Sequence, residues 1–227
     1  MAERPGARLA RRPLHLFFLV DCSGSMQSEG KMQALNVAVR EALPHLSAVV
    51  QAAPHAEILV RAIAFGSTAR WHLQTPTPPQ AVEWQDVGAG GYTELGQALD
   101  LLCSVMTVPP MERRALPPAI ILVSDGMPTD DYAPALERLL ATPWGARSIR
   151  MAVGIGRDAD HETLVSFIGD DSLEPLSANN PEQLVDAIRW VSTQVSRAAS
   201  TLTNSLPRAP VNRAPQLEAD EDAVIVW

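Results

Sequence analysis

The stretch that decides the fold reads LHLFFLVDCSGS and spans residues 14–25. Its first seven residues are almost all apolar, and the run stops at Asp21, where a polar turn containing Gly24 begins. A short, nearly continuous apolar run is typical of a β-strand that is covered on both faces. The sequence therefore predicts a buried strand over 14–20 that ends in an acidic, glycine-bearing loop.

A second stretch repeats this pattern further along the chain. Residues 119–123 read AIILV and are followed directly by Ser124, Asp125 and Gly126. In an open parallel sheet, ligands bind outside the carboxyl ends of the strands. The loops that begin after Val20 and Val123 are therefore the places to look for a site.

The remaining periodicities predict how the chain is built around these two strands. Strands are expected over 57–65, 69–73 and 148–155, and the first two are close enough to form an antiparallel hairpin at the edge of the sheet. The prolines at 76, 78 and 79 are expected to exclude regular structure until the glycine-rich loop 88–91. Helices are expected over 31–51, 94–106, 160–168 and 181–197.

The last of these helices carries clear start signals. Asn180 stands at the cap, Pro181 at the first helical position and Gln183 in the capping-box position. Strands that alternate with helices at this spacing predict an α/β fold of the doubly wound class. The central sheet should be mostly parallel, with one antiparallel edge strand and helices on both faces.

Composition excludes several classes of protein. The chain has 227 residues, of which 46% are hydrophobic and 19% charged, a balance that can bury a core. The formal net charge of -8 argues against nucleic acid as a partner, since backbone binding depends on clustered Lys and Arg. The only two cysteines, Cys22 and Cys103, form no CxxC pair, so we expect neither a disulfide framework nor a zinc knuckle. A reducing, cytoplasmic location fits best.

The two ends differ in character from the middle of the chain. Residues 1–13 form a basic arm that imitates the start of a signal peptide, but the apolar run after it is too short to span a membrane, which needs about 20 residues. Residues 14–199 are expected to form one domain. Residues 200–227 are interpreted as a proline-containing linker and acidic tail, whose apolar end, 224–227, is a candidate for docking to a partner or another copy.

Five oxygen-bearing side chains are expected to meet at the carboxyl edge of the sheet. Asp21, Ser23 and Ser25 come from the first loop, Asp125 from the second, and Thr93 from the head of the helix that the glycine-rich loop opens. Carboxylates and hydroxyls without imidazole suit a hard ion, so Mg²⁺ or Mn²⁺, or alternatively Ca²⁺, is expected rather than zinc.

Residues 17–26, 90–93 and 123–126 resemble the metal-ion-dependent adhesion site of von Willebrand factor A domains, and the element order resembles that family over roughly residues 14–199. The resemblance implies that Ser23, Ser25 and Thr93 offer hydroxyls to the ion, while Asp21 and Asp125 act directly or through water. It also implies a non-catalytic module in which an acidic side chain of a protein partner completes the coordination of the ion.

Within the family, the motifs look closest to the TerY-like branch associated with bacterial tellurite resistance. That branch is similar to components of stress or defence clusters that contain a Ser/Thr kinase and a PP2C-type phosphatase, so these are the partners the resemblance implies. Some other relatives pair with an AAA-type ATPase, which stays open as an alternative partner.

An enzyme is the alternative from another class. An aspartate directly after an apolar strand is also found in haloacid-dehalogenase-like phosphohydrolases. In this chain Ser23 stands where the second aspartate of those enzymes would be, and a serine is no general acid.

Two further patterns are interpreted as structural rather than functional. Residues 154–159 read GIGRDA and imitate a dinucleotide-binding fingerprint, but they come late in the chain, and a flexible strand exit explains both glycines. Cys22 lies inside the metal loop, where a buried, small apolar role is expected rather than redox chemistry.

Overall fold

A computed structural model describes residues 11–52, 56–157, 159–180, 182–190 and 193. The predictions for the arm before residue 11 and for the tail over 200–227 lie outside the described residues. Six strands form one sheet in the order β3-β2-β1-β4-β5-β6. They are β1 (Arg12–Asp21), β2 (Ala56–Phe65), β3 (Ala69–Thr77), β4 (Ala119–Ser124), β5 (Ile149–Ile155) and β6 (Leu176–Ala178). Only the pairing of β2 with β3 is antiparallel, which confirms the predicted mixed sheet with one antiparallel edge strand.

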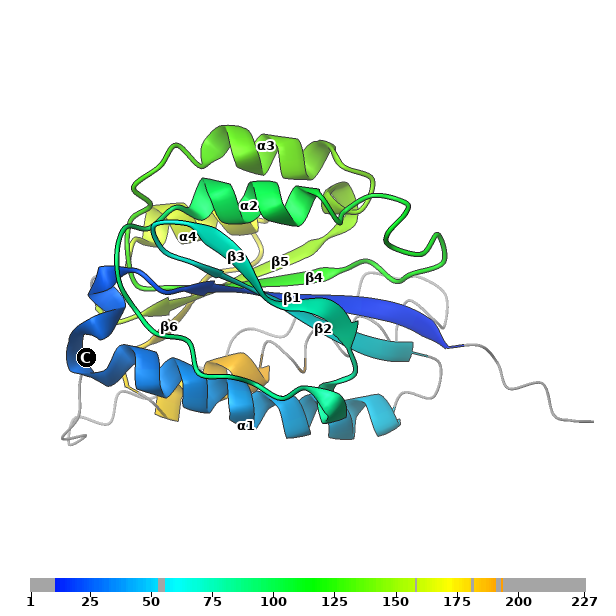
Figure 1. The fold of residues 1–227 in the computed structure, drawn as a ribbon, viewed down its shortest axis with the longest axis horizontal. Coiled ribbons are helices and arrows are strands. Elements are labelled where there is room, and N and C mark those ends of the chain that lie inside the picture. Colours follow the sequence, from blue (N-terminus) through cyan, green and yellow to red (C-terminus); the bar gives the residue numbers. More distant parts are fainter. Residues whose placement is uncertain (1–10, 53–55, 158, 181, 191–192, 194–227) are drawn as a thin grey trace, which may run out of the picture.

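Helices cover both faces of this sheet, as predicted (Figure 1). One face carries α1 (Lys31–Ala52) together with the helical residues 182–190, and the other carries α2 (Leu95–Cys103), α3 (Ala133–Ala141) and α4 (His161–Ile168). Short 3-10 segments are η1 (Gly24–Gly30), η2 (Pro79–Ala81) and η3 (Gly145–Arg147).

The central strand β1 explains why the first apolar run has no polar face. Phe18 and Val20 point into the core layer under α1, whereas Phe17 and Leu19 point into the layer under α2 and α3. Successive side chains of a strand alternate between the two faces, so a strand that is covered twice needs apolar residues at nearly every position. All four of these side chains are fully buried.

Some expected elements have different bounds in the structure. β3 continues through Pro76 to Thr77, so the expectation that the prolines exclude regular structure there is wrong. An edge strand accepts proline because it need not donate a hydrogen bond on its outer side. The expected helix over 94–106 ends at Cys103, where the Ser104 hydroxyl donates to the Leu101 carbonyl at 2.6 Å.

Two elements were not predicted at all, and one predicted helix start is confirmed. The additional elements are α3 and the short strand β6. At the start of the last helix, Gln183 donates its N–H to the Asn180 side chain at 2.8 Å, while its own amide oxygen accepts from Asn179 N at 2.8 Å. The bond to Asn180 is the expected cap contact, whereas the return bond of the predicted capping box comes from Asn179, one residue before the cap.

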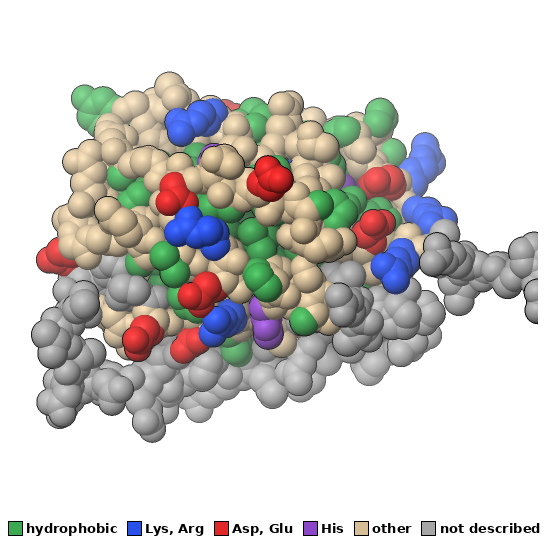
Figure 2. Space-filling view, turned by 60° about the horizontal axis from the view of Figure 1, so that its bottom comes forward, with side chains coloured by type: hydrophobic (Ala, Val, Ile, Leu, Met, Phe, Trp, Pro, Cys, Tyr) green, Lys and Arg blue, Asp and Glu red, His purple; other side chains and the backbone are tan. Residues whose placement is uncertain are grey.

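The surface on the α1 side mixes charges of both signs. Figure 2 shows Lys and Arg side chains interspersed with Asp and Glu on the face it draws, without one large basic patch there. Two ion pairs fasten exposed side chains of α1, Arg40 with Asp86 and Glu41 with Arg189. Within the described part of the chain, no helix has the length and apolar character needed to cross a membrane.

Candidate metal site

The candidate site lies where β1 and β4 end side by side. These strands pair in parallel, with Val20 opposite Val123, so the two loops that follow them begin next to each other. Both aspartates are almost completely buried, Asp21 at 0% and Asp125 at 2% relative exposure. The sheet therefore brings together two acidic loops that are far apart in the sequence.

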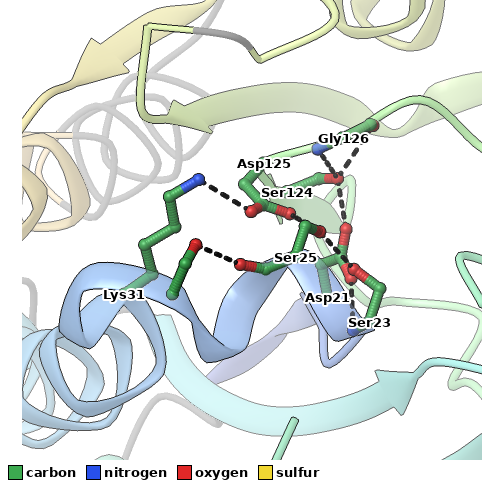
Figure 3. Close-up of polar contacts among 8 residues, drawn as sticks. Asp21, Ser23, Ser25, Lys31, Ser124, Asp125 and Gly126 are labelled. Carbon is green, nitrogen blue, oxygen red and sulfur yellow. Dashed lines mark hydrogen bonds and ion pairs between the residues drawn. The ribbon is translucent and has the colours of Figure 1, made fainter. Parts of the chain in front are cut away.

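Hydroxyls and a carboxylate form a continuous chain across this edge (Figure 3). The hydroxyl oxygens of Ser23 and Ser25 lie 2.9 Å apart, and the Ser25 hydroxyl donates to Asp125 Oδ1 at 2.7 Å. Ser23 is buried, whereas Ser25, in the middle of this chain of contacts, is exposed. Three of the five predicted ligands thus meet directly, from two separate loops.

Asp21 anchors the base of the site. Its Oδ1 accepts the backbone N–H of Ser23 at 2.8 Å, and its Oδ2 accepts the Ser124 hydroxyl at 2.5 Å. Burial raises the pKa of the Asp21 carboxyl, the hydrogen bonds from Ser124 and Ser23 lower it, and the nearby Asp125 raises it again, with a net upward shift. A buried carboxylate in this position is stabilised by a nearby cation.

The glycine-rich loop that leads to Thr93 lies against the first metal loop. Gly24 N donates to Gly91 O at 2.9 Å, and Gly90 N donates to Cys22 O at 2.7 Å, so the two loops are joined through their backbones. Thr93 is buried, with 6% exposure. Thr129 holds its backbone from both sides, accepting from Thr93 N at 3.0 Å and donating to Thr93 O at 2.9 Å. The Thr93 hydroxyl forms no hydrogen bond with the other residues that the structure describes.

Three residues at the site were missed in the sequence. Ser124 binds Asp21, Thr129 positions Thr93, and Lys31 pairs with Asp125 through a 2.9 Å contact from Nζ to Oδ2. Ser124 lies within the quoted Ser-Asp-Gly motif, so its place next to Asp125 was a usable signal. No local pattern marks Lys31 or Thr129, because their partners are distant in the sequence.

Cys22 lies in the metal loop but is turned away from solvent. Its thiol is buried and donates weakly to Val20 O at 3.6 Å. Burial raises its pKa to about 12, with Asp21 adding to the shift and Arg70 opposing it. A thiol with this pKa carries almost no thiolate at neutral pH, which fits the expected small, buried role.

The donor set fits a hard divalent ion. No group of three or more His, Cys, Asp or Glu side chains suited to a metal occurs among the described residues. Asp21, Asp125, Ser23, Ser25 and Thr93 offer only oxygen, as Mg²⁺ and Mn²⁺ prefer. The fold and this site define a class of protein, a doubly wound α/β domain with an oxygen-lined candidate cation site at the carboxyl edge of its sheet.

Comparison with known proteins identifies the family. A model of the von Willebrand factor type A domain matches residues 15–187, and the chain belongs to that family. A comparison with curated proteins gives no match.

Solved structures of the family share the fold at low sequence identity. A von Willebrand factor type A protein from Catenulispora acidiphila has a TM-score of 0.62 and 19% identity, covering 82% of this chain and 43% of its own. The ArnB paralog VWA2 from Sulfolobus acidocaldarius has a TM-score of 0.57 and 20% identity, and the match covers 79% of this chain and 45% of that protein. Proximal thread matrix protein 1 of the mussel byssus, with a zinc-occupied MIDAS motif, has a TM-score of 0.57 and 16% identity, and the match covers 80% of this chain and 48% of that protein. This chain therefore spans less than half the length of these three proteins.

Proposed function

We propose that this protein is a non-catalytic interaction module that binds a divalent cation and uses it to hold an acidic side chain of a protein partner. The observation that carries the proposal is the contact chain from Ser23 through Ser25 to Asp125, which lies beside the buried Asp21 at the end of β1. Domains of this family are typically interaction modules rather than enzymes, which supports the same interpretation.

The proposed ligands of the ion are the hydroxyls of Ser23, Ser25 and Thr93 and the carboxylates of Asp21 and Asp125. A bound divalent ion supplies a Lewis-acidic centre that attracts an incoming carboxylate. The mussel protein with a zinc-occupied MIDAS motif supports a divalent ion in this type of site. Mg²⁺ is our proposed ion, because the donors here are all oxygen.

The partner class is proposed from the resemblance of the motifs to the TerY-like branch. On that basis we propose a Ser/Thr kinase, a PP2C-type phosphatase or an assembly of both in a bacterial stress or defence system. The alternative partner is an AAA-type ATPase. In either case the partner contributes a carboxylate to the ion, and recognition requires the loaded site.

Direct ion binding is the first test. Free Mn²⁺ is measured by electron paramagnetic resonance during titration into wild-type protein and into Ser25→Ala and Ser104→Ala variants. Wild type should bind one ion per chain, and Ser25→Ala should bind it about tenfold more weakly or worse. Ser104→Ala is the matched control, since among the described residues this exposed hydroxyl bonds only the Leu101 carbonyl. Equal binding by all three proteins would exclude the proposed ligand set.

Partner capture is the second test. Immobilised wild type and Asp21→Ala are compared with Mg²⁺ and with EDTA, and proteins released by EDTA are identified by mass spectrometry. Recovery of a kinase or phosphatase only from wild type with Mg²⁺ supports the proposed system, and recovery of an ATPase instead replaces it with the alternative. If EDTA and the Asp21→Ala mutation leave the captured proteins unchanged, the adhesion mechanism is overturned. A separate assay tests the enzyme alternative: Mg²⁺-dependent turnover of p-nitrophenyl phosphate that Asp21→Ala abolishes would establish a phosphohydrolase instead.

A further inference from the structure

A buried lysine lies against the candidate metal site. Lys31 is the first residue of α1, and its side chain is only 4% exposed. Its ammonium pairs with Asp125 Oδ2 at 2.9 Å, and the Asp125 side chain is 0% exposed (Figure 3). Removing both charges from water is costly, so an ion pair at this depth calls for an explanation beyond surface solubility.

The pair determines how Asp125 faces the site. One oxygen of the carboxylate, Oδ2, is held by Lys31, and the other, Oδ1, accepts the Ser25 hydroxyl at 2.7 Å. The carboxylate is thereby fixed in orientation, with Oδ1 on the side of the serine hydroxyls. Lys31 therefore acts on the site through Asp125.

The charge of the site follows from the same residues. Asp21 and Asp125 are the two carboxylates of the candidate site, and Lys31 is paired with Asp125. With Lys31 present, these three groups sum to one negative charge, and a divalent ion changes the sum to one positive charge. Without Lys31, each of these sums would be lower by one positive charge, so the site would attract a divalent ion more strongly and, once loaded, an incoming carboxylate less strongly.

We propose that Lys31 is a positioning and charge-setting residue that weakens ion binding but strengthens the capture of an acidic side chain by the ion-loaded site. This inference rests on the proposed function, because it concerns the same site. Charge interactions at a site removed from water are several times stronger than in bulk solvent. One buried ammonium is therefore sufficient to lower the affinity for the ion and to raise the affinity of the loaded site for a carboxylate. A merely structural ion pair would not move them in opposite directions.

The test compares wild type with Lys31→Met and Lys31→Arg. Mn²⁺ affinity is measured by electron paramagnetic resonance, and carboxylate capture is measured by the broadening of the acetate methyl proton signal by bound Mn²⁺. Lys31→Met should bind Mn²⁺ about tenfold more tightly and acetate about tenfold more weakly, whereas Lys31→Arg, which keeps the charge, should stay within about threefold of wild type in both.

Each outcome decides between the two proposals. If wild type binds Mn²⁺ through Ser25 but Lys31→Met leaves both affinities unchanged, the role of Lys31 is overturned and the proposed function stands. If wild type binds no Mn²⁺, the proposed function fails first. Should Lys31→Met not fold, as judged by circular dichroism, Lys31→Gln replaces it, and a fall in Mn²⁺ affinity with this neutral variant would also overturn the proposal.

Discussion

Asn36 fastens the loop that leads to Thr93, and its replacement should show how much stability this contact provides. Asn36 lies on α1 with 3% exposure. Its amide nitrogen donates to Val87 O at 3.0 Å and to Met32 O at 3.0 Å, and its oxygen accepts from Val87 N at 2.9 Å and Trp84 Nε1 at 3.0 Å. One side chain therefore satisfies both backbone groups of the buried Val87.

The magnitude follows from the groups that Asn36→Leu would leave without partners. The N–H and C=O of Val87 are buried between α1 and the loop, and an unsatisfied buried backbone group costs about 1–3 kcal/mol. Trp84 is half-buried, so its Nε1 can turn to water at little cost. The leucine gains about 1 kcal/mol from burial, which leaves an expected net loss of about 3 kcal/mol in the free energy of unfolding.

Urea unfolding followed by tryptophan fluorescence measures this loss. Gln33→Leu is the matched control, because Gln33 is an exposed amide on the same helix and its replacement should change stability by less than about 0.5 kcal/mol. The thermal midpoint of Asn36→Leu should fall by about 6–12 °C. A loss below about 1 kcal/mol, or one equal to that of the control, would refute the view that Asn36 holds the loop.

Three further outcomes are expected. Gly91→Ala should destabilise the protein by about 1–3 kcal/mol and weaken Mn²⁺ binding, because Gly91 has φ +86° and an added Cβ would lie 2.0 Å from the Ser67 hydroxyl. Gly88→Ala is the control: an added Cβ at Gly88 would have no atom within 4 Å, so stability and Mn²⁺ binding should not change. Burial lowers the pKa of His15 below its ordinary 6.5, so as the pH falls this histidine takes up a proton in the unfolded chain before it does so in the folded protein. The free energy of unfolding should therefore decline below about pH 6.5, and urea unfolding at pH 7.5 and 5.5 should show a smaller decline for His15→Leu. The Cys22 thiol, with a pKa of about 12, should resist iodoacetamide at pH 8 in the native protein, and mass-spectrometric labelling of this residue within minutes would contradict its burial.

Much of the fold was predictable from local patterns, and the exceptions share a physical cause. The apolar runs that form β1 and β4 are readable because a strand that is covered on both faces needs apolar residues throughout. Of the two glycines expected at the exit of the strand over 148–155, Gly156 follows β5 and has φ +89°, whereas Gly154 lies within β5. The missed α3 is short, and only three of its side chains, Ala135, Leu136 and Leu139, are buried, so its periodic signal is weak. β6 has three residues and is defined by its pairing with β5 alone.

By itself, the sequence determined the candidate donors and the edge at which they lie, because each acidic loop directly follows a buried strand and parallel strands share one carboxyl edge. Only the tertiary structure decided that β1 and β4 are neighbours and that the Ser25 hydroxyl bonds Asp125. It also decided the charge beside the site, since Lys31 meets Asp125 across 94 residues of sequence. Such contacts depend on the packing of α1 against the sheet, and no local pattern of residues encodes them.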